Sequence, residues 1–115
     1  MRVKRGVTTH AKHKRLKAQV KGMTASRQAS VKLARQAVLK ALSYQYRDRR
    51  NGKRDFRALW ITRINAGLNG TGLSYSRFIG ALKSANIELD RKILAELATN
   101  MPSAFKSVID SASTK

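Results

Sequence analysis

The stretch YRDRRNGKRDFRALW, residues 46–60, joins a dense cluster of positive charge to an abrupt apolar segment. Six cations and two anions stand within residues 47–57. Three apolar residues follow almost at once: Leu59, Trp60 and Ile61. Like charges at such short spacing repel one another, so a partner outside the chain is expected to neutralise them.

If this stretch is helical, four arginines fall in one row along the helix. Their spacing of three, four and three residues places them on one face: Arg47, Arg50, Arg54 and Arg57. The same row continues into three apolar residues: Ile61, Ile64 and Leu68. Asp48 and Asp55 have no Arg or Lys three or four positions away, so such local ion pairs would not neutralise the row. The pattern predicts an exposed cationic track that is anchored in a core at its apolar end.

The charge of the chain divides it into two regions. The 115 residues carry a formal net charge of +19. Residues 1–63 hold 19 cations and 2 acids, whereas residues 64–115 hold 6 cations and 4 acids. Self-repulsion opposes compaction of the first region, which we expect to stay extended or loosely helical until a polyanion neutralises it. We therefore predict an extended basic RNA-binding arm and long helix over 1–63, and a small helical globular domain over 64–115.

Helical periodicity without strand-like alternation predicts an all-α fold. In the first region it indicates a short helix from Thr9, as its cap, to Lys21. It also indicates one helix over 25–68, capped by Thr24 or Ser26, which would span about 65 Å. The pair Asn51-Gly52 is typical of turns, but no alternating pattern flanks it, so we expect a weak point in the helix rather than a break.

In the second region, turn and capping signals separate three short amphipathic helices. The glycines predict a loop: Gly67, Gly70 and Gly72. Ser74 and Asp90 are predicted N-caps, and Pro102 stands at a first-turn position. The expected inward faces are Tyr75, Phe78, Ile79 and Leu82, then Ile93, Leu94 and Leu97, then Phe105, Val108 and Ile109. We expect these helices to share one core with the end of the long helix.

The sequence excludes several classes of protein. It has no cysteine, no apolar run approaching the ~18 residues of a membrane helix, and no apolar segment of a secretory signal. A mitochondrial transit peptide is a weaker interpretation of the basic N-terminus, because the charge continues to residue 63. No paired carboxylates, nucleophile with a base, or phosphate-binding glycine loop is present, so we expect no enzyme and no cofactor. His10 and His13 lack further ligands nearby, and we interpret them as neutral members of the RNA-facing arm rather than a metal site.

The basic run is best explained as a track for phosphate. A guanidinium group can bind phosphate through two hydrogen bonds and can stack on bases. The cations of the arm before the long helix would add to it: Arg2, Lys4, Arg5, Lys12, Lys14, Arg15, Lys17, Lys21 and Arg27. Tyr44, Tyr46, Phe56 and Trp60 lie close enough for stacking on unpaired bases, although core packing is the better interpretation of Phe56 and Trp60.

Four segments together resemble one known family. They are RVKRGV (2–7), YRDRRNGKRDFRALWITRINA (46–66), LSYSRFI (73–79) and ALKSANIELDRKILAELA (81–98). In this order they resemble the bacterial large-subunit ribosomal protein L20 family over nearly the full chain. The resemblance implies an all-α protein whose basic extension enters large-subunit rRNA and whose C-terminal helical domain also contacts rRNA. It implies a role in subunit assembly and a place in the cytoplasmic ribosome rather than an organellar one. The partners that it implies are neighbouring ribosomal proteins and, in addition, the protein's own mRNA.

The resemblance also implies particular RNA-binding residues. They are Arg2, Lys4, Arg5 and Gly6, the residues from Tyr46 to Arg57 (Tyr46, Arg47, Arg49, Arg50, Lys53, Arg54 and Arg57 among them), Trp60 and Arg63, and then Ser74, Tyr75, Ser76, Arg91 and Lys92. No homo-oligomer is expected. Two rivals stay open: a DNA-architectural, nucleoid-type protein, which would bind duplex DNA equally well, and a cationic membrane-active protein, which the lack of a broad apolar stripe disfavours.

Overall fold

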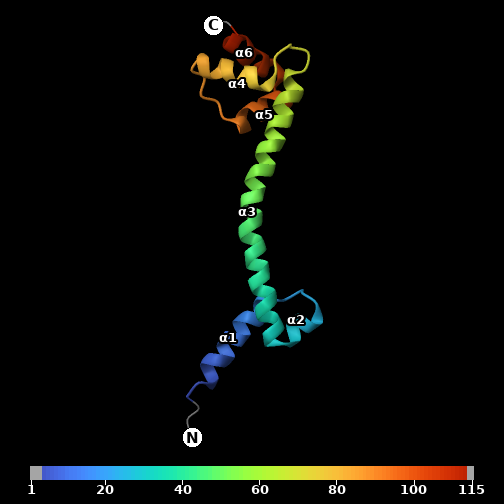
Figure 1. The fold of residues 1–115 in the computed structure, drawn as a ribbon, viewed down its shortest axis with the longest axis vertical. Helices are drawn as coiled ribbons and strands as arrows, with labels where there is room; N and C mark the ends of the chain where they lie inside the picture. The colour runs from blue at the N-terminus through green and yellow to red at the C-terminus, as the bar shows by residue number, and fades with distance from the viewer. Residues whose placement is uncertain (1–3, 114–115) are drawn as a thin grey trace. The chain divides into compact units, whose positions relative to one another are not determined.

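The computed structural model of the chain describes residues 4–113, and within this range it contains six α-helices and no strand (Figure 1). The helices are α1 (Gly6–Gln19), α2 (Ala25–Ala29), α3 (Val31–Leu68), α4 (Tyr75–Ser84), α5 (Arg91–Asn100) and α6 (Pro102–Ser113). The predicted all-α fold class is confirmed.

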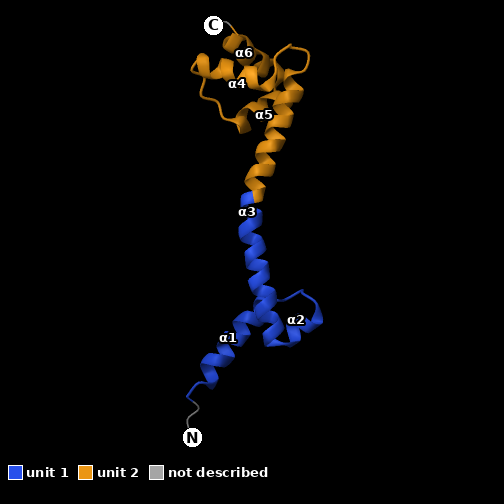
Figure 2. Ribbon diagram, viewed as in Figure 1, with its two compact units in different colours: residues 1–50 blue, residues 51–115 orange. Residues whose placement is uncertain are grey.

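The chain forms two compact units, residues 1–50 and residues 51–115 (Figure 2). The division falls within α3, which contributes its first part to one unit and its last part to the other. The functional division that we predict after residue 63 is a different boundary, defined by charge, and it stays a prediction.

The first unit has a small apolar core of its own. Four side chains are buried in it: Val20, Ala34, Ala37 and Val38. A turn after α1 brings Val20 to α3: Gly22 adopts the left-handed φ of +84°, and the Met23 N–H donates to the Val20 carbonyl at 3.1 Å. Leu16 and Met23 pack against the cluster from its edge. Apolar packing, besides charge, therefore organises this part of the basic region.

The predicted single helix over 25–68 is wrong at Ser30. This residue is extended (φ −99°, ψ 127°) and separates α2 from α3. Its N–H donates to the Ser26 carbonyl at 3.3 Å, and its carbonyl accepts from the Ala34 N–H at 2.8 Å, so one residue ends α2 and begins α3. Serine tolerates such a position better than the interior of a helix, and the bend accompanies the packing of Val20 on Ala34.

The other predicted boundaries in this unit have mixed outcomes. The short helix begins at Gly6 rather than after a cap at Thr9, and Thr8 Oγ1 donates to the Arg5 carbonyl at 2.9 Å in its first turn. Thr24 occupies the N-cap position of α2 but makes no capping hydrogen bond with its side chain.

Helix α3 continues without a break through Asn51 and Gly52. Gly52 has no positive φ, and a Cβ built on it would meet nothing within 4 Å. The prediction of continuity is confirmed, and neither steric crowding nor backbone geometry requires glycine at this position.

The second unit packs the end of α3 against α4, α5 and α6 (Figure 1). Its buried residues are Ile64, Leu68, Phe78, Leu82, Leu94, Ala95, Phe105, Ile109 and Ala112. The rings of Phe78 and Phe105 meet edge to face, with centroids 5.6 Å apart. The predicted core shared by three short helices and the end of the long one is confirmed.

Gly67 lies inside α3 and not in the predicted loop, which occupies residues 69–74. A Cβ built on Gly67 would lie 2.9 Å from both Ala98 Cβ and Phe105 Cε1. Gly67 is therefore a close-packing glycine, whereas Gly70 and Gly72 form the turn with φ of +83° and +74°.

Local signals located the starts of the three short helices correctly. Ser74 Oγ accepts from the Arg77 N–H at 3.5 Å, Asp90 Oδ1 accepts from the Ile93 N–H at 2.9 Å, and α6 begins at Pro102. The predicted inward position of Ile93 is wrong: this side chain is 43% exposed, and Ala95 packs in the core instead. The buried face of α5 is therefore shifted by about one residue from the predicted face, because small alanines as well as large side chains fill it.

Candidate nucleic-acid interface

The four arginines of the row stand on the exposed surface of α3. Arg47, Arg50, Arg54 and Arg57 are all exposed. Farther along the row, Ile61 is half-buried, and Ile64 and Leu68 belong to the core of the second unit. The same helical face thus changes from solvated guanidinium groups to buried apolar side chains, as the spacing predicts.

The first two arginines of the row are held by neighbouring side chains. The Arg47 guanidinium carbon lies 4.5 Å from the centroid of the Tyr44 ring, and Arg47 Nε donates to Asp48 Oδ1 at 2.9 Å. The Arg50 guanidinium carbon lies 3.6 Å from the Tyr46 centroid, and its Nη1 donates to the Tyr46 carbonyl at 3.3 Å. Each guanidinium therefore rests on an aromatic ring, an arrangement that orients it.

The pairing of Arg47 with Asp48 corrects one expectation, because the prediction considered only neighbours three and four positions away. The pair is exposed on both sides, and such surface pairs contribute about 0–1 kcal/mol to stability. Among the described residues, Arg54 and Arg57 have no acidic partner. The row therefore keeps most of its positive charge free for an external anion.

The aromatic residues near the row differ in their exposure. Tyr46 is 55% exposed and Phe56 is 59% exposed. Trp60 is half-buried against the core of the second unit, with its ring 6.4 Å from that of Phe56. The core interpretation holds for Trp60 but is wrong for Phe56, whose flat apolar ring stands among cations. Phe56 is thus a better stacking candidate than the sequence indicates, because the sequence favours core packing as the interpretation of its ring.

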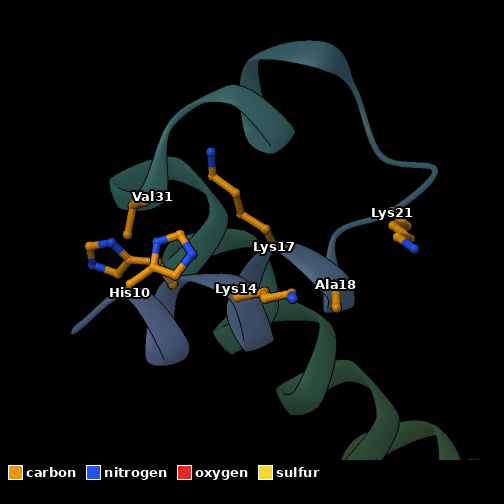
Figure 3. A pocket seen from close by; sticks show the side chains of 7 residues that line it. His10, Lys14, Lys17, Ala18, Lys21 and Val31 are labelled. Carbon is orange, nitrogen blue, oxygen red and sulfur yellow. The ribbon is translucent and has the colours of Figure 1, made fainter. Parts of the chain in front are cut away.

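The predicted cations of the arm lie on the surface of the first unit. Lys4, Arg5, Lys12, Lys14, Arg15, Lys17, Lys21 and Arg27 are exposed. Arg2 lies outside the described residues. Three of these lysines line one groove of about 550 Å³ together with His10, His13 and Val31: Lys14, Lys17 and Lys21 (Figure 3).

The two histidines share this groove with cations. Within residues 4–113, no group of three or more His, Cys, Asp or Glu side chains lies together in a way that could hold a metal ion. Lysine ammonium groups repel a metal cation and attract an anion, so the chemistry of the groove suits phosphate. The interpretation of His10 and His13 as part of the basic arm agrees with this position.

In the second unit the structure joins two predicted residues that stand 16 positions apart. Arg91 Nε donates to Tyr75 Oη at 2.7 Å, and Tyr75 is half-buried against the core. This hydrogen bond fixes the guanidinium at the start of α5. Ser74 serves as the cap of α4, while Ser76, Lys92 and Arg63 are exposed.

Taken together, an all-α fold and exposed, largely unpaired arginines and lysines beside exposed aromatic rings are typical of a nucleic-acid-binding protein. No helix among the described residues is long and apolar enough to cross a membrane. The profile of the family described as "Ribosomal protein L20" matches residues 2–108, and the chain belongs to this family.

Individual relatives agree over nearly the whole chain. The large ribosomal subunit protein bL20 of Erythrobacter litoralis (strain HTCC2594) is 59% identical over 111 residues, which cover 96% of this chain and 93% of that protein. The protein of the same name from Roseiflexus sp. (strain RS-1) is 58% identical, over 96% of this chain and 95% of that protein. The one from Pelagibacter ubique (strain HTCC1062) is 53% identical, over 96% and 94%. The predicted family resemblance is confirmed. The chain is a structural ribosomal protein and not an enzyme, and rRNA binding is the known role of its family.

Proposed function

We propose that this chain is a structural constituent of the large subunit of the cytoplasmic ribosome, where it binds large-subunit rRNA through its arm and α3 and helps the subunit to assemble. The row of exposed arginines from Arg47 to Arg57 carries this proposal. The acidic side chains near the row are too few to neutralise it, so its cations can bind phosphate. Family membership supports the ribosomal role, and no observation favours the DNA-architectural alternative.

Affinity and specificity would come from different parts of the chain. Neutralising phosphates releases counterions from the RNA, which supplies affinity but little sequence information. Exposed rings such as Tyr46 and Phe56 can stack on unpaired bases, a mode of recognition that a regular duplex does not offer. We assign residues 1–63 to the phosphate-binding arm and long helix, and residues 64–115 to a helical domain that fixes the position of the protein on the RNA.

The helical domain would add fewer RNA contacts. Arg91, held by Tyr75, and Lys92 next to it are its candidate phosphate ligands, at the start of α5. Exposed apolar residues on the same unit, Ile93 and Met101, suit contacts with neighbouring ribosomal proteins. Binding to the protein's own mRNA would use the same phosphate and base contacts.

A salt titration of RNA binding tests the proposal. The change is the simultaneous replacement of Arg47, Arg50, Arg54 and Arg57 by Ala in the full chain. We expect weaker binding to large-subunit rRNA and a slope of log affinity against log salt that is smaller by up to about 4, because each lost phosphate contact lowers the slope by about 1. Filter binding or fluorescence anisotropy between low and physiological salt measures both quantities.

Duplex DNA of equal length is the control ligand. A preference for rRNA that persists at physiological salt supports the ribosomal role, whereas equal binding to both ligands would favour the DNA-architectural alternative. An unchanged slope in the fourfold variant would refute the arginine row as the phosphate track.

A further inference from the structure

A second groove in the first unit differs in chemistry from the lysine-lined groove. It has a volume of about 560 Å³ and lies along the first four turns or so of α3, beside α2 and the turn before it. Leu33 and Tyr44 line it together with Ala37, and Arg27 and Lys40 bring two cations to it. Arg27 also belongs to the proposed phosphate-binding arm, and the Tyr44 ring also contacts Arg47 of the arginine row, whereas Leu33, Ala37 and Lys40 belong to neither. The groove therefore adjoins the row and adds a surface of different chemistry to it.

We infer that this groove binds one unstacked nucleotide of the RNA, with its base against Leu33 and Tyr44 and its phosphates near Arg27 and Lys40. The inference rests on the proposed binding to rRNA and adds a base-binding site to it. The volume lies within the roughly 300–1,000 Å³ that is usual for pockets of small ligands.

The apolar part of the groove supports a base as its occupant. Leu33 is 41% exposed and Tyr44 is 44% exposed, so both leave apolar surface in water next to the buried Ala37. Covering such surface is favourable, and a base has a flat face that can do so. A base paired within a duplex cannot enter a groove of this kind, which limits the ligand to a loop, bulge or end of the RNA.

The polar part of the groove supports a nucleotide rather than an apolar peptide. Gln36 lines it and offers an amide donor and an amide acceptor at the exposed surface. A glutamine amide can pair with the edge of a base through two hydrogen bonds. Lys40 Nζ lies 5.7 Å from the centroid of the Tyr44 ring, so a cation stands beside the stacking surface.

Charge decides between RNA and a protein segment as the occupant. The cations at the groove, Arg27 and Lys40, lie on α2 and α3, and no acidic residue lines the groove. Every nucleotide brings a phosphate with its base, so it satisfies the cations and the apolar surface together. The lysine-lined groove of Figure 3 differs in that its rings are the imidazoles of two histidines beside three lysines, and no side-chain amide lines it, so its chemistry suits phosphate better than a base.

A matched pair of double variants tests the inference in the full chain. The groove variant carries Leu33→Ala and Gln36→Ala, and the control carries Leu39→Ala and Gln45→Ala. The control changes the same residue types on the same helix at two exposed positions that do not line the groove. None of the four residues belongs to the core, and equal helical circular dichroism of the two variants would show that both fold alike.

The probe is large-subunit rRNA, titrated across salt concentrations. We expect the groove variant to bind about tenfold more weakly at every salt concentration, with an unchanged salt slope, because a base contact releases no counterion. The control should stay within about twofold of the unmodified protein. Dimethyl sulfate probing of the bound RNA should show a base that the unmodified protein and the control protect and the groove variant does not.

The outcomes separate the inference from the proposed function. If the unmodified protein shows no preference for rRNA, the proposed function fails. If it binds rRNA and the groove variant behaves like the control, the base site alone is refuted. A groove variant that binds more weakly but leaves the same base protected from dimethyl sulfate would also overturn the inference, since the lost affinity would then not come from a base in the groove.

Discussion

The two compact units are both helical, yet their cores differ in kind. The first buries Val20 and Val38 among alanines, whereas the second buries nine residues that include Phe78 and Phe105 in edge-to-face contact. Stability from burial follows the apolar area removed from water, so we expect the second unit to be the more stable of the two. In the first unit, repulsion among the many cations opposes the small stabilisation that burial of its core supplies. A bound polyanion would neutralise these cations and so stabilise the folded unit.

The largest expected effect comes from removing an aromatic side chain of the second core. Phe78→Ala should lower the free energy of unfolding of this unit by about 3–5 kcal/mol, because it deletes a fully buried ring and leaves a cavity. Val20→Ala in the first core should cost only about 1–2 kcal/mol, since fewer buried methyl groups are lost. Urea denaturation followed by circular dichroism measures both. Equal costs would contradict the contrast between the two cores.

A methyl group added at Gly67 should have a smaller effect. Gly67→Ala places a Cβ 2.9 Å from atoms of Ala98 and Phe105, and overpacking of this kind costs about 1–3 kcal/mol. The gain of about 1 kcal/mol in helix propensity offsets part of that cost. We expect a lower midpoint of thermal unfolding. A midpoint equal to or above that of the unmodified chain would show that α5 and α6 shift to accept the methyl group.

The smallest effect, of opposite sign, is expected at the other glycine of α3. Gly52→Ala meets no atom within 4 Å and should stabilise the helix by up to about 1 kcal/mol, without loss of rRNA binding. Helical circular dichroism and the rRNA salt titration test the two parts. Weaker rRNA binding with intact helicity would mean that the RNA backbone approaches Gly52 closely.

The sequence correctly predicted the features that are determined by residues close together in the chain. Ser74, Asp90 and Pro102 mark helix starts by local chemistry, and all three predictions are correct. The bend at Ser30 and the helical, close-packed state of Gly67 depend on contacts with segments that are distant in the sequence. The bend at Ser30 accompanies the packing of Val20 on α3, and the close packing of Gly67 requires the ring of Phe105. Local sequence patterns therefore predict neither feature.

The same distinction applies to the candidate interface. The helical spacing of the arginines predicts one exposed row, and the helix presents it. Phe56 and Trp60 are one turn apart and similar in chemistry, yet only Trp60 reaches the second core. Which of two aromatic rings becomes buried depends on the position of the helix relative to its packing partners, and hydrophobicity alone does not encode that position.

The stacking of guanidinium groups on tyrosine rings has a consequence for the kinetics of binding. Arg50 is held by the Tyr46 ring and a backbone carbonyl, so it loses little side-chain entropy when a phosphate arrives. Arg54 and Arg57 have no such support and lose more rotamer freedom on binding. One row thus contains both a preorganised contact, ready at first encounter, and adaptable ones that can follow an RNA whose shape still changes during assembly.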